Sequence, residues 1–118
     1  MDRNKREVGA SYEKIAEEFL LSNNIRIVER NFRTRFGEID LIGYDGEYLV
    51  FFEVKYRRTK LYGAPVQAVN TGKQHVICRV ADFYRMKKRI GDFEPMRFDI
   101  ISIHNGKITW YKNAYDYC

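Results

Sequence analysis

Three carboxylates and one ammonium in one stretch of the chain have the types and spacing that could form a site for a divalent metal ion. Glu38 and Asp40 are two residues apart, and Glu53 and Lys55 repeat that spacing after an apolar run. Side chains alternate across a strand, so residues two apart project from the same face. Asp and Glu oxygens are the hard ligands that Mg²⁺ prefers. The stretch therefore predicts a metal site on the face of a β-sheet.

The element expected to position these side chains is a β-hairpin over residues 37–57. Asp45 and Gly46 suit the positive φ values of a tight turn between two strands. If they form the centre of the turn, Glu38 lies opposite Glu53 and the charged side chains share one face. Like charges that face each other destabilise a sheet. A bound divalent cation would offset that repulsion.

The same residues also have a simpler interpretation. Exposed strand faces commonly carry Glu and Lys, and a Glu-x-Lys triplet such as Glu53 to Lys55 arises easily by chance. Two features favour a functional site. Glu53 ends a strongly apolar strand, where the middle of a sheet is expected, and Asp40 lies one hairpin away on the matching face.

Composition limits the class of protein. The chain has 118 residues and 45% hydrophobic residues, enough for one domain with a real core. Lys and Arg number 21 against 16 acidic residues, and the net charge of +5 is compatible with a polyanionic partner. No apolar run approaches a membrane span or a signal peptide, so we expect a cytoplasmic protein. The two cysteines and two histidines lack metal-ligand spacing, which argues against a disulfide scaffold or a zinc site.

Apolar periodicity predicts a single α/β or α+β domain, with a mixed sheet flanked by helices in the order αβββαββ. The expected elements are a helix over 8–22, a strand over 25–32, the hairpin, a helix that opens at Pro65 and is capped by Gly91, and strands over 96–104 and 107–111. Residues 1–7 and 112–118 are expected as flexible tails.

Basic residues flank the hairpin on both sides. Residues 56–64 combine three cations with two tyrosines. Aromatic rings interleaved with Arg and Lys suit phosphate contact and base stacking, although a solvated loop has the same composition. The cations expected to contact nucleic acid are Arg33, Arg35, Arg57, Arg58, Lys60 and Lys73.

Together these pieces resemble the YraN-like family of small uncharacterised bacterial proteins. That family is placed in the PD-(D/E)xK nuclease superfamily and is related to Holliday-junction resolvases. The matching pieces are Gly9-x-x-x-Glu13-x-x-Ala16, Asn31-Phe32-Arg33, Gly37-Glu38-Ile39-Asp40-Leu41-Ile42, Phe52-Glu53-Val54-Lys55-x-Arg57, Gly63-x-Pro65, Lys73 and Arg97-Phe98-Asp99. Ile39 stands where the superfamily signature has Pro, a position that supplies no ligand.

The resemblance implies a restriction-endonuclease-like domain and a metal-dependent endonuclease, a hydrolase acting on phosphodiester bonds of DNA, including branched DNA. It implies Mg²⁺ or Mn²⁺ held by Asp40, Glu53 and the carbonyl of Val54. Lys55 would orient or activate the attacking water, and Glu13 matches a helix acid that often completes such sites.

Other residues are expected to surround that site without holding the metal. Glu38 is expected as a salt-bridge partner or an outer group, and Gln67 lies in the first turns of the second helix, near the hairpin. Arg97 and Asp99 are expected to form a structural ion pair.

Two further functions stay open. One is a nucleic-acid-binding module with the nuclease fold and no efficient cleavage. The other is a protein-interaction domain whose acidic patch is incidental. DNA is the expected partner of the nuclease and of the nucleic-acid-binding module, and the residues do not distinguish DNA from RNA. A homodimer is an assembly to test.

Overall fold

The computed structural model describes residues 5–57 and 69–118. Its elements are α1 (Lys5–Ser22), β1 (Arg26–Arg33), β2 (Glu38–Asp45), β3 (Tyr48–Arg57), α2 (Thr71–Lys87), β4 (Met96–His104) and β5 (Lys107–Tyr115). The expected order αβββαββ is confirmed. The five strands form one mixed sheet in the order β1-β2-β3-β4-β5, in which only one pair, β3 and β4, is parallel. This arrangement is consistent with a restriction-endonuclease-like fold.

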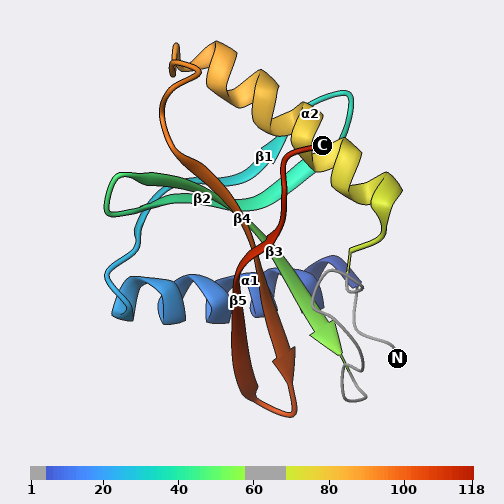
Figure 1. Ribbon diagram of the computed structural model, residues 1–118. Helices are drawn as coiled ribbons and strands as arrows, with labels where there is room; N and C mark the ends of the chain where they lie inside the picture. The colour runs from blue at the N-terminus through green and yellow to red at the C-terminus, as the bar shows by residue number, and fades with distance from the viewer. Residues whose placement is uncertain (1–4, 58–68) are drawn as a thin grey trace.

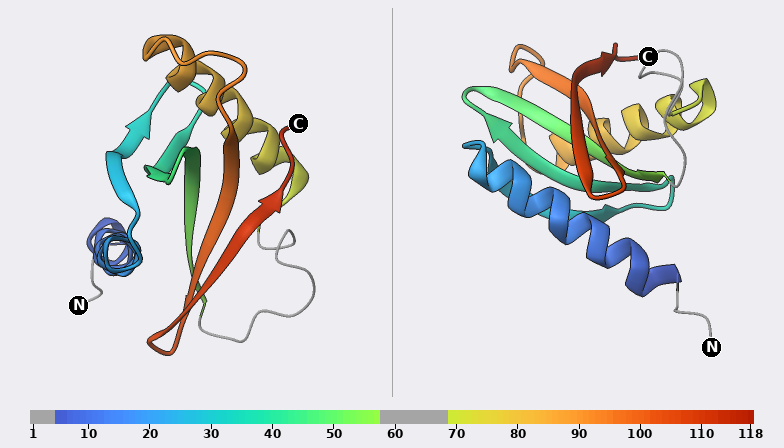
Figure 2. Two further views of the ribbon diagram at one scale, coloured as in Figure 1. Left: turned by 60° about the vertical axis from the view of Figure 1, so that its left-hand side comes forward. Right: turned by 90° about the horizontal axis from the view of Figure 1, so that it is seen from below.

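The two helices cover opposite faces of the sheet (Figures 1 and 2). Alternation along the strands places apolar side chains on both faces of the sheet. Leu41 and Phe52 pack under α1, while Ile42 and Phe51 pack under α2. A sheet buried on both faces needs strands that are apolar at every position, which explains the unbroken apolar run from Leu49 to Phe52. Neither described helix combines the length and the apolar character needed to cross a membrane.

The amino end of α2 is set by an asparagine. The helix begins at Thr71, and the Asn70 side chain accepts a 2.8 Å hydrogen bond from the Lys73 backbone N–H. Asparagine is a preferred residue at this position because its oxygen satisfies an N–H group that has no partner within the helix. The expected opening at Pro65 lies outside the described residues.

The carboxyl end of α2 is formed by the cap residue Lys88 and the left-handed Arg89, and the expected cap at Gly91 is wrong. Arg89 has φ 56°, its N–H bonds to the Met86 carbonyl at 3.2 Å, and the Ile90 N–H bonds to the Arg85 carbonyl at 2.8 Å. This pair of bonds is the Schellman motif, which requires a left-handed residue directly after the helix. Packing of Ile90 against the core on the α2 face stabilises the motif despite the side chain on Arg89.

The carboxyl-terminal residues are held against the sheet and α2, which differs from the expected flexible tail over 112–118. Strand β5 continues to the buried Tyr115, and the Tyr117 hydroxyl donates a 2.7 Å hydrogen bond to Asp82. The backbone N–H of Cys118 donates to the sulfur of Cys78 at 3.3 Å. Both cysteines are free thiols.

Candidate functional site

The register of the β2–β3 hairpin differs by two residues from the expected one. Asp45 pairs with Tyr48, so the turn is made by Gly46 and Glu47. Gly46 has φ 61°, and glycine at the first central position is typical of a type II′ hairpin turn. The expectation that Glu38 faces Glu53 is therefore wrong.

This register brings the two expected metal ligands opposite each other. The last regular pair is Leu41 with Phe52, and the next position along each strand is Asp40 and Glu53. The backbone pairing stops there, and the Asp40 carboxylate instead accepts a 2.8 Å hydrogen bond from the Val54 backbone N–H. The Asp40 side chain thus fills the gap that opens between β2 and β3.

The opening of the strands also separates the four charged side chains onto two faces. Leu41 packs under α1, whereas Ile39 packs under α2, so the alternation is interrupted at Asp40. Glu38 consequently points to the α1 side, where it forms an ion pair with Arg33. The expected single acidic face is wrong because one irregular residue breaks the two-residue period.

Glu53 is a buried acid with incomplete hydrogen bonding. It is 7% exposed, and its Oε2 receives no hydrogen bond from the described residues. Lys55 Nζ lies 3.9 Å from its Oε1, and Lys73 at the start of α2 is near enough to lower its pKa. Burial outweighs both cations and, with the nearby Asp40 charge, raises the pKa of Glu53 to about 8.

The Asp40 and Glu53 carboxyl groups are close enough to share a proton. Burial raises the pKa of Asp40 as well, although its hydrogen bond from Val54 opposes that change. A hydrogen bond donated by the protonated Glu53 to Asp40 raises the pKa of the donor and lowers that of the acceptor. Such a pair resists carrying two negative charges unless a cation lies beside it.

A separate acidic group lies on the α1 side of Asp40. Glu13 is half-buried, and burial, followed by the charges of Asp40 and Glu38, raises its pKa to about 7. Asn31 opposes this rise through a side-chain hydrogen bond to Glu13. A cleft of about 240 Å³ is lined there by Ala10, Glu13, Asn31, Arg33 and Glu38. Sequence reasoning missed Asn31, whose left-handed φ of 51° was signalled only by its residue type.

The donor set fits a hard divalent ion with few protein ligands. Across residues 5–57 and 69–118, no three His, Cys, Asp or Glu side chains are grouped so that they could hold a metal ion. Two opposed carboxylates remain, one of them with an oxygen that receives no hydrogen bond. Mg²⁺ is usually bound by one or two carboxylates together with waters and substrate phosphates. The role of the Val54 carbonyl stays a prediction.

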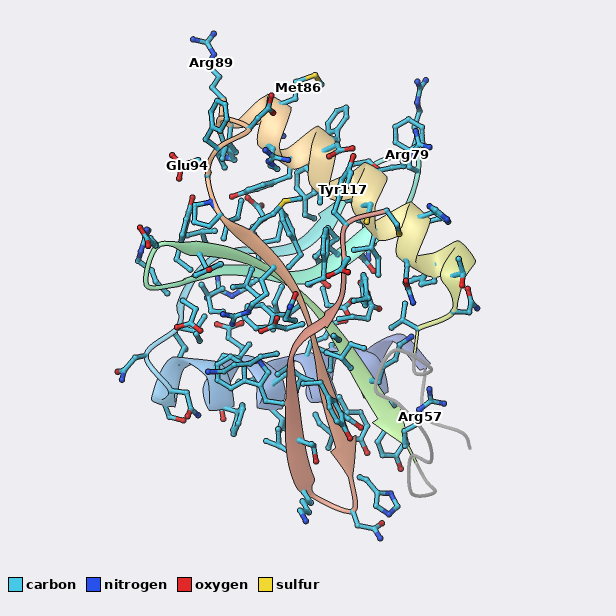
Figure 3. All side chains as sticks on the ribbon, viewed as in Figure 1. Arg57, Arg79, Met86, Arg89, Glu94 and Tyr117 are labelled. Atoms are coloured by element: carbon cyan, nitrogen blue, oxygen red, sulfur yellow. The ribbon has the colours of Figure 1, made fainter. Side chains whose placement is uncertain are left out.

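The expected cations are distributed around the site in different states. Arg33 is engaged by Glu38, Arg35 lies over the ring of Phe36, and Lys73 acts on Glu53. Arg57 lies at the end of β3, far from Arg89 at the other end of the molecule (Figure 3). Arg58, Lys60 and Gln67 lie outside the described residues.

A stacked pair of tyrosines near this end of β3 was not singled out from the sequence. The rings of Tyr12 in α1 and Tyr56 in β3 lie 4.0 Å apart and nearly parallel, at 16°. Their neighbours in the chain are Glu13 and Lys55. The stack fastens α1 to the strand that carries the candidate site.

The expected ion pair between Arg97 and Asp99 is confirmed. Two nitrogens of Arg97 donate to the fully buried Asp99 at 2.9 Å, and one also reaches Asp45 at 2.9 Å. The Trp110 indole N–H and the Asn113 backbone N–H complete the shell of Asp99 at 2.8 and 2.9 Å. The hydrogen bonds of the Asp99 carboxylate are all made within the fold, so this ion pair has a structural role.

Comparison with known proteins places the chain in a family. Residues 12–103 match the family described as "Uncharacterised protein family UPF0102". A UPF0102 protein of Legionella pneumophila strain Corby is 41% identical over 112 residues, covering 93% of this chain and 95% of that protein. A UPF0102 protein of Clostridium tetani is 43% identical over 103 residues, covering 87% and 84% of the two chains. The chain therefore belongs to the UPF0102, or YraN-like, family.

Proposed function

We propose that this protein is a metal-dependent nuclease that hydrolyses phosphodiester bonds of DNA. The observation that carries the proposal is the pair of opposed carboxylates, the half-buried Asp40 and the buried Glu53, with Lys55 beside them. Strongly raised pKa values of neighbouring acids are common at functional sites, because burial that costs stability is kept where it serves chemistry. The resemblance to PD-(D/E)xK nucleases supports the same assignment.

The metal ion would supply a polarised phosphoryl oxygen and a bound water of lowered pKa. Asp40 and Glu53 would hold that ion, and the Val54 N–H fixes the Asp40 carboxylate for this role. Lys55 is half-buried, so its ammonium is oriented more firmly than an exposed lysine would be. It would stabilise the negative charge that develops on the phosphate.

The proton shared by Asp40 and Glu53 gives the site a pH-dependent metal affinity. Carboxylates bind a metal in the ionised form, so metal binding must release that proton. Glu13 would remain outside the metal shell, on the α1 side, where its raised pKa lets it hold a proton near neutral pH. A proton carrier there would suit a leaving group or a water of the reaction.

The test is cleavage of a panel of linear, flapped and four-way DNA, and of matched RNA, with Mg²⁺ or Mn²⁺. We expect Glu53→Gln and Asp40→Asn to abolish cleavage and to weaken Mn²⁺ binding measured by calorimetry. Glu47→Gln is the matched control, because Glu47 is an exposed acid in the turn of the same hairpin. Equal Mn²⁺ affinity in all three variants and the wild type would remove the basis of the proposed site.

The same panel separates the proposal from a nucleic-acid-binding module. A module binds DNA with or without metal and cleaves none of the substrates. Its affinity still falls with salt, with a slope of roughly 0.9 per phosphate neutralised on duplex DNA. Binding without turnover under all metal conditions would therefore support the module and contradict the nuclease.

A further inference from the structure

An exposed aromatic ring lies beside the turn between β1 and β2, outside the carboxylate pair. An open depression of about 360 Å³ is lined there by Phe36, His75, Val76 and Arg79. Phe36 remains 49% exposed. Turn tips usually carry Gly, Pro, Asn, Asp or Ser, which form turns without exposing apolar surface. Turn formation alone therefore does not account for this ring.

The turn that carries the ring is rigid. Thr34 and Gly37 exchange backbone hydrogen bonds at 2.8 and 3.3 Å, and the Phe36 N–H donates to the Thr34 hydroxyl at 3.0 Å. Gly37 packs directly on α2, because a Cβ at that position would lie 2.6 Å from the Val76 side chain. A ring held in place before binding loses little conformational entropy when it contacts a ligand.

The surface around the ring is cationic. The Arg35 guanidinium lies 5.0 Å from the Phe36 ring centroid, and Arg79 lines the depression. Neither arginine forms an ion pair with another residue in the described part of the chain, in contrast to Arg30 and Arg33 in β1, which do. An apolar ring that shares a depression with cations lacking ion-pair partners is complementary to a nucleobase with flanking phosphates.

We propose that this depression binds an unpaired nucleotide of a DNA strand, with the base stacked on Phe36 and the phosphates against Arg35 and Arg79. The choice of DNA rests on the proposed function. A base inside a duplex has no free face to offer a side chain, whereas every unpaired base does. The depression would therefore select a substrate with a single-stranded segment.

Helix α2 connects this subsite to the carboxylate pair. Lys73, Val76 and Arg79 follow one another at intervals of three residues, so each neighbours the next on the helix surface, and the first and last are about 120° apart around the axis. At 1.5 Å per residue, Lys73 and Arg79 are about 9 Å apart along the axis. Lys73 acts on Glu53, so a strand that follows α2 from Arg79 to Lys73 approaches the candidate active site.

The test measures binding of a fluorescent single-stranded oligonucleotide and a blunt duplex in EDTA, so that no cleavage is needed. We expect Phe36→Ala to weaken single-strand binding by about 5- to 150-fold, the range of base–aromatic stacking, and to change duplex binding less than twofold. Phe36→Leu should show a similar loss, and Phe36→Trp should retain binding. Phe93→Ala is the matched control, because Phe93 is fully exposed in the loop after α2.

Each outcome decides the point. Equal affinities of Phe36→Ala and Phe93→Ala, wild-type affinity of Phe36→Leu, or equal losses on single strand and duplex would each overturn the subsite. Failure of the wild type to bind either oligonucleotide would also overturn it. Cleavage with no effect of Phe36 leaves the nuclease proposal intact, whereas Phe36-dependent binding without cleavage leaves the subsite intact and removes the nuclease.

Discussion

Asp99 and Asp40 each accept a hydrogen bond from a backbone N–H of the neighbouring strand at a point where regular pairing is interrupted. The donor to Asp99 is Asn113, across the irregularity between β4 and β5. The donor to Asp40 is Val54, where β2 leaves β3. In both places a carboxylate replaces a backbone carbonyl as acceptor, which lets the strands separate without leaving an unpaired N–H.

The two regions differ in what surrounds the carboxylate. Asp99 accepts four hydrogen bonds, two of them from Arg97, so its negative charge is neutralised inside the fold. Asp40 faces a second acid, Glu53, and the ammonium of Lys55 lies 3.9 Å from Glu53, too far for a hydrogen bond. The first group is electrostatically complete, whereas the second is short of positive charge. This difference separates a structural centre from a candidate binding centre.

The largest effect is expected when the electrostatically complete centre, that of Asp99 and Arg97, is broken. Asp99→Ala leaves the Arg97 charge without its main buried partner, and we expect a loss of about 3–5 kcal/mol in the free energy of unfolding. Urea unfolding measures it, with Asp116→Ala as the control, because Asp116 is exposed in the same part of the chain. A loss below about 1 kcal/mol would show that the two centres do not differ in this way.

The next effect concerns the incomplete centre and the ammonium of Lys55. Lys55→Met keeps most of the apolar stem and removes the charge, so we expect turnover to fall roughly 10²-fold or more. Metal binding should survive, and DNA binding should fall only modestly, since Asp40, Glu53 and the other cations remain. That selectivity is typical of a group that acts mainly in the transition state.

Lys107→Met is the control for this prediction, because Lys107 is exposed at the start of β5. Single-turnover cleavage with Mg²⁺ and binding in EDTA separate the two quantities. If wild type cleaves and Lys55→Met cleaves equally well, the ammonium has no role in the reaction.

The comparison also shows how much of the site the sequence could predict. The element order, the hairpin and the pairing of Arg97 with Asp99 follow from periodicity, turn residues and charge. The register could not be derived, because Asp45 and Gly46 allow two neighbouring turns and a shift of two residues preserves the faces. The interruption at Asp40 was equally invisible, since it depends on a hydrogen bond to Val54 across the sheet.

The ends of α2 show a second limit of sequence reasoning. Sequence reasoning placed the cap at Gly91 and did not single out Asn70 or Arg89, although an asparagine before a helix is itself a strong signal. Arg89 had no local signal for a left-handed φ. Its conformation is decided by the packing of Ile90 on the core, which is a tertiary effect.

A pH dependence of stability is the third expected difference between the centres. The pKa of Glu53 rises from its ordinary 4.5 to about 8 in the folded protein, so the folded chain holds a proton that the unfolded chain has released. The contribution of Glu53 to stability is therefore fully present below pH 4.5 and is lost as the pH rises to about 8, by at most about 1.4 kcal/mol per pH unit for one proton.

Glu53→Gln should make this fall smaller, because the amide does not titrate. Glu13, whose pKa is also raised, to about 7, still contributes below that pH. Glu47→Gln should leave the profile unchanged. The measurement is urea unfolding from pH 5 to pH 9 in EDTA. Added Mg²⁺ should reduce the fall for the wild type, since it favours the ionised pair. Parallel profiles for wild type and Glu53→Gln would show that the Glu53 carboxyl does not hold an extra proton in the folded protein.

The smallest effect tests how far the complete centre extends toward the surface. Asp45 accepts a 2.9 Å hydrogen bond from Arg97, but its side chain is 32% exposed, against 0% for Asp99. Water can replace it as a partner, so Asp45→Asn should cost less than about 1 kcal/mol of unfolding free energy, in the range of exposed ion pairs. The cost should shrink in high salt, because screening acts on exposed charges more than on buried ones.

Asp99→Asn is the matched comparison, and its larger cost should persist in salt. Equal losses for the two asparagine variants would mean that Arg97 depends on both carboxylates together. The burial of the partner would then not determine the loss in unfolding free energy.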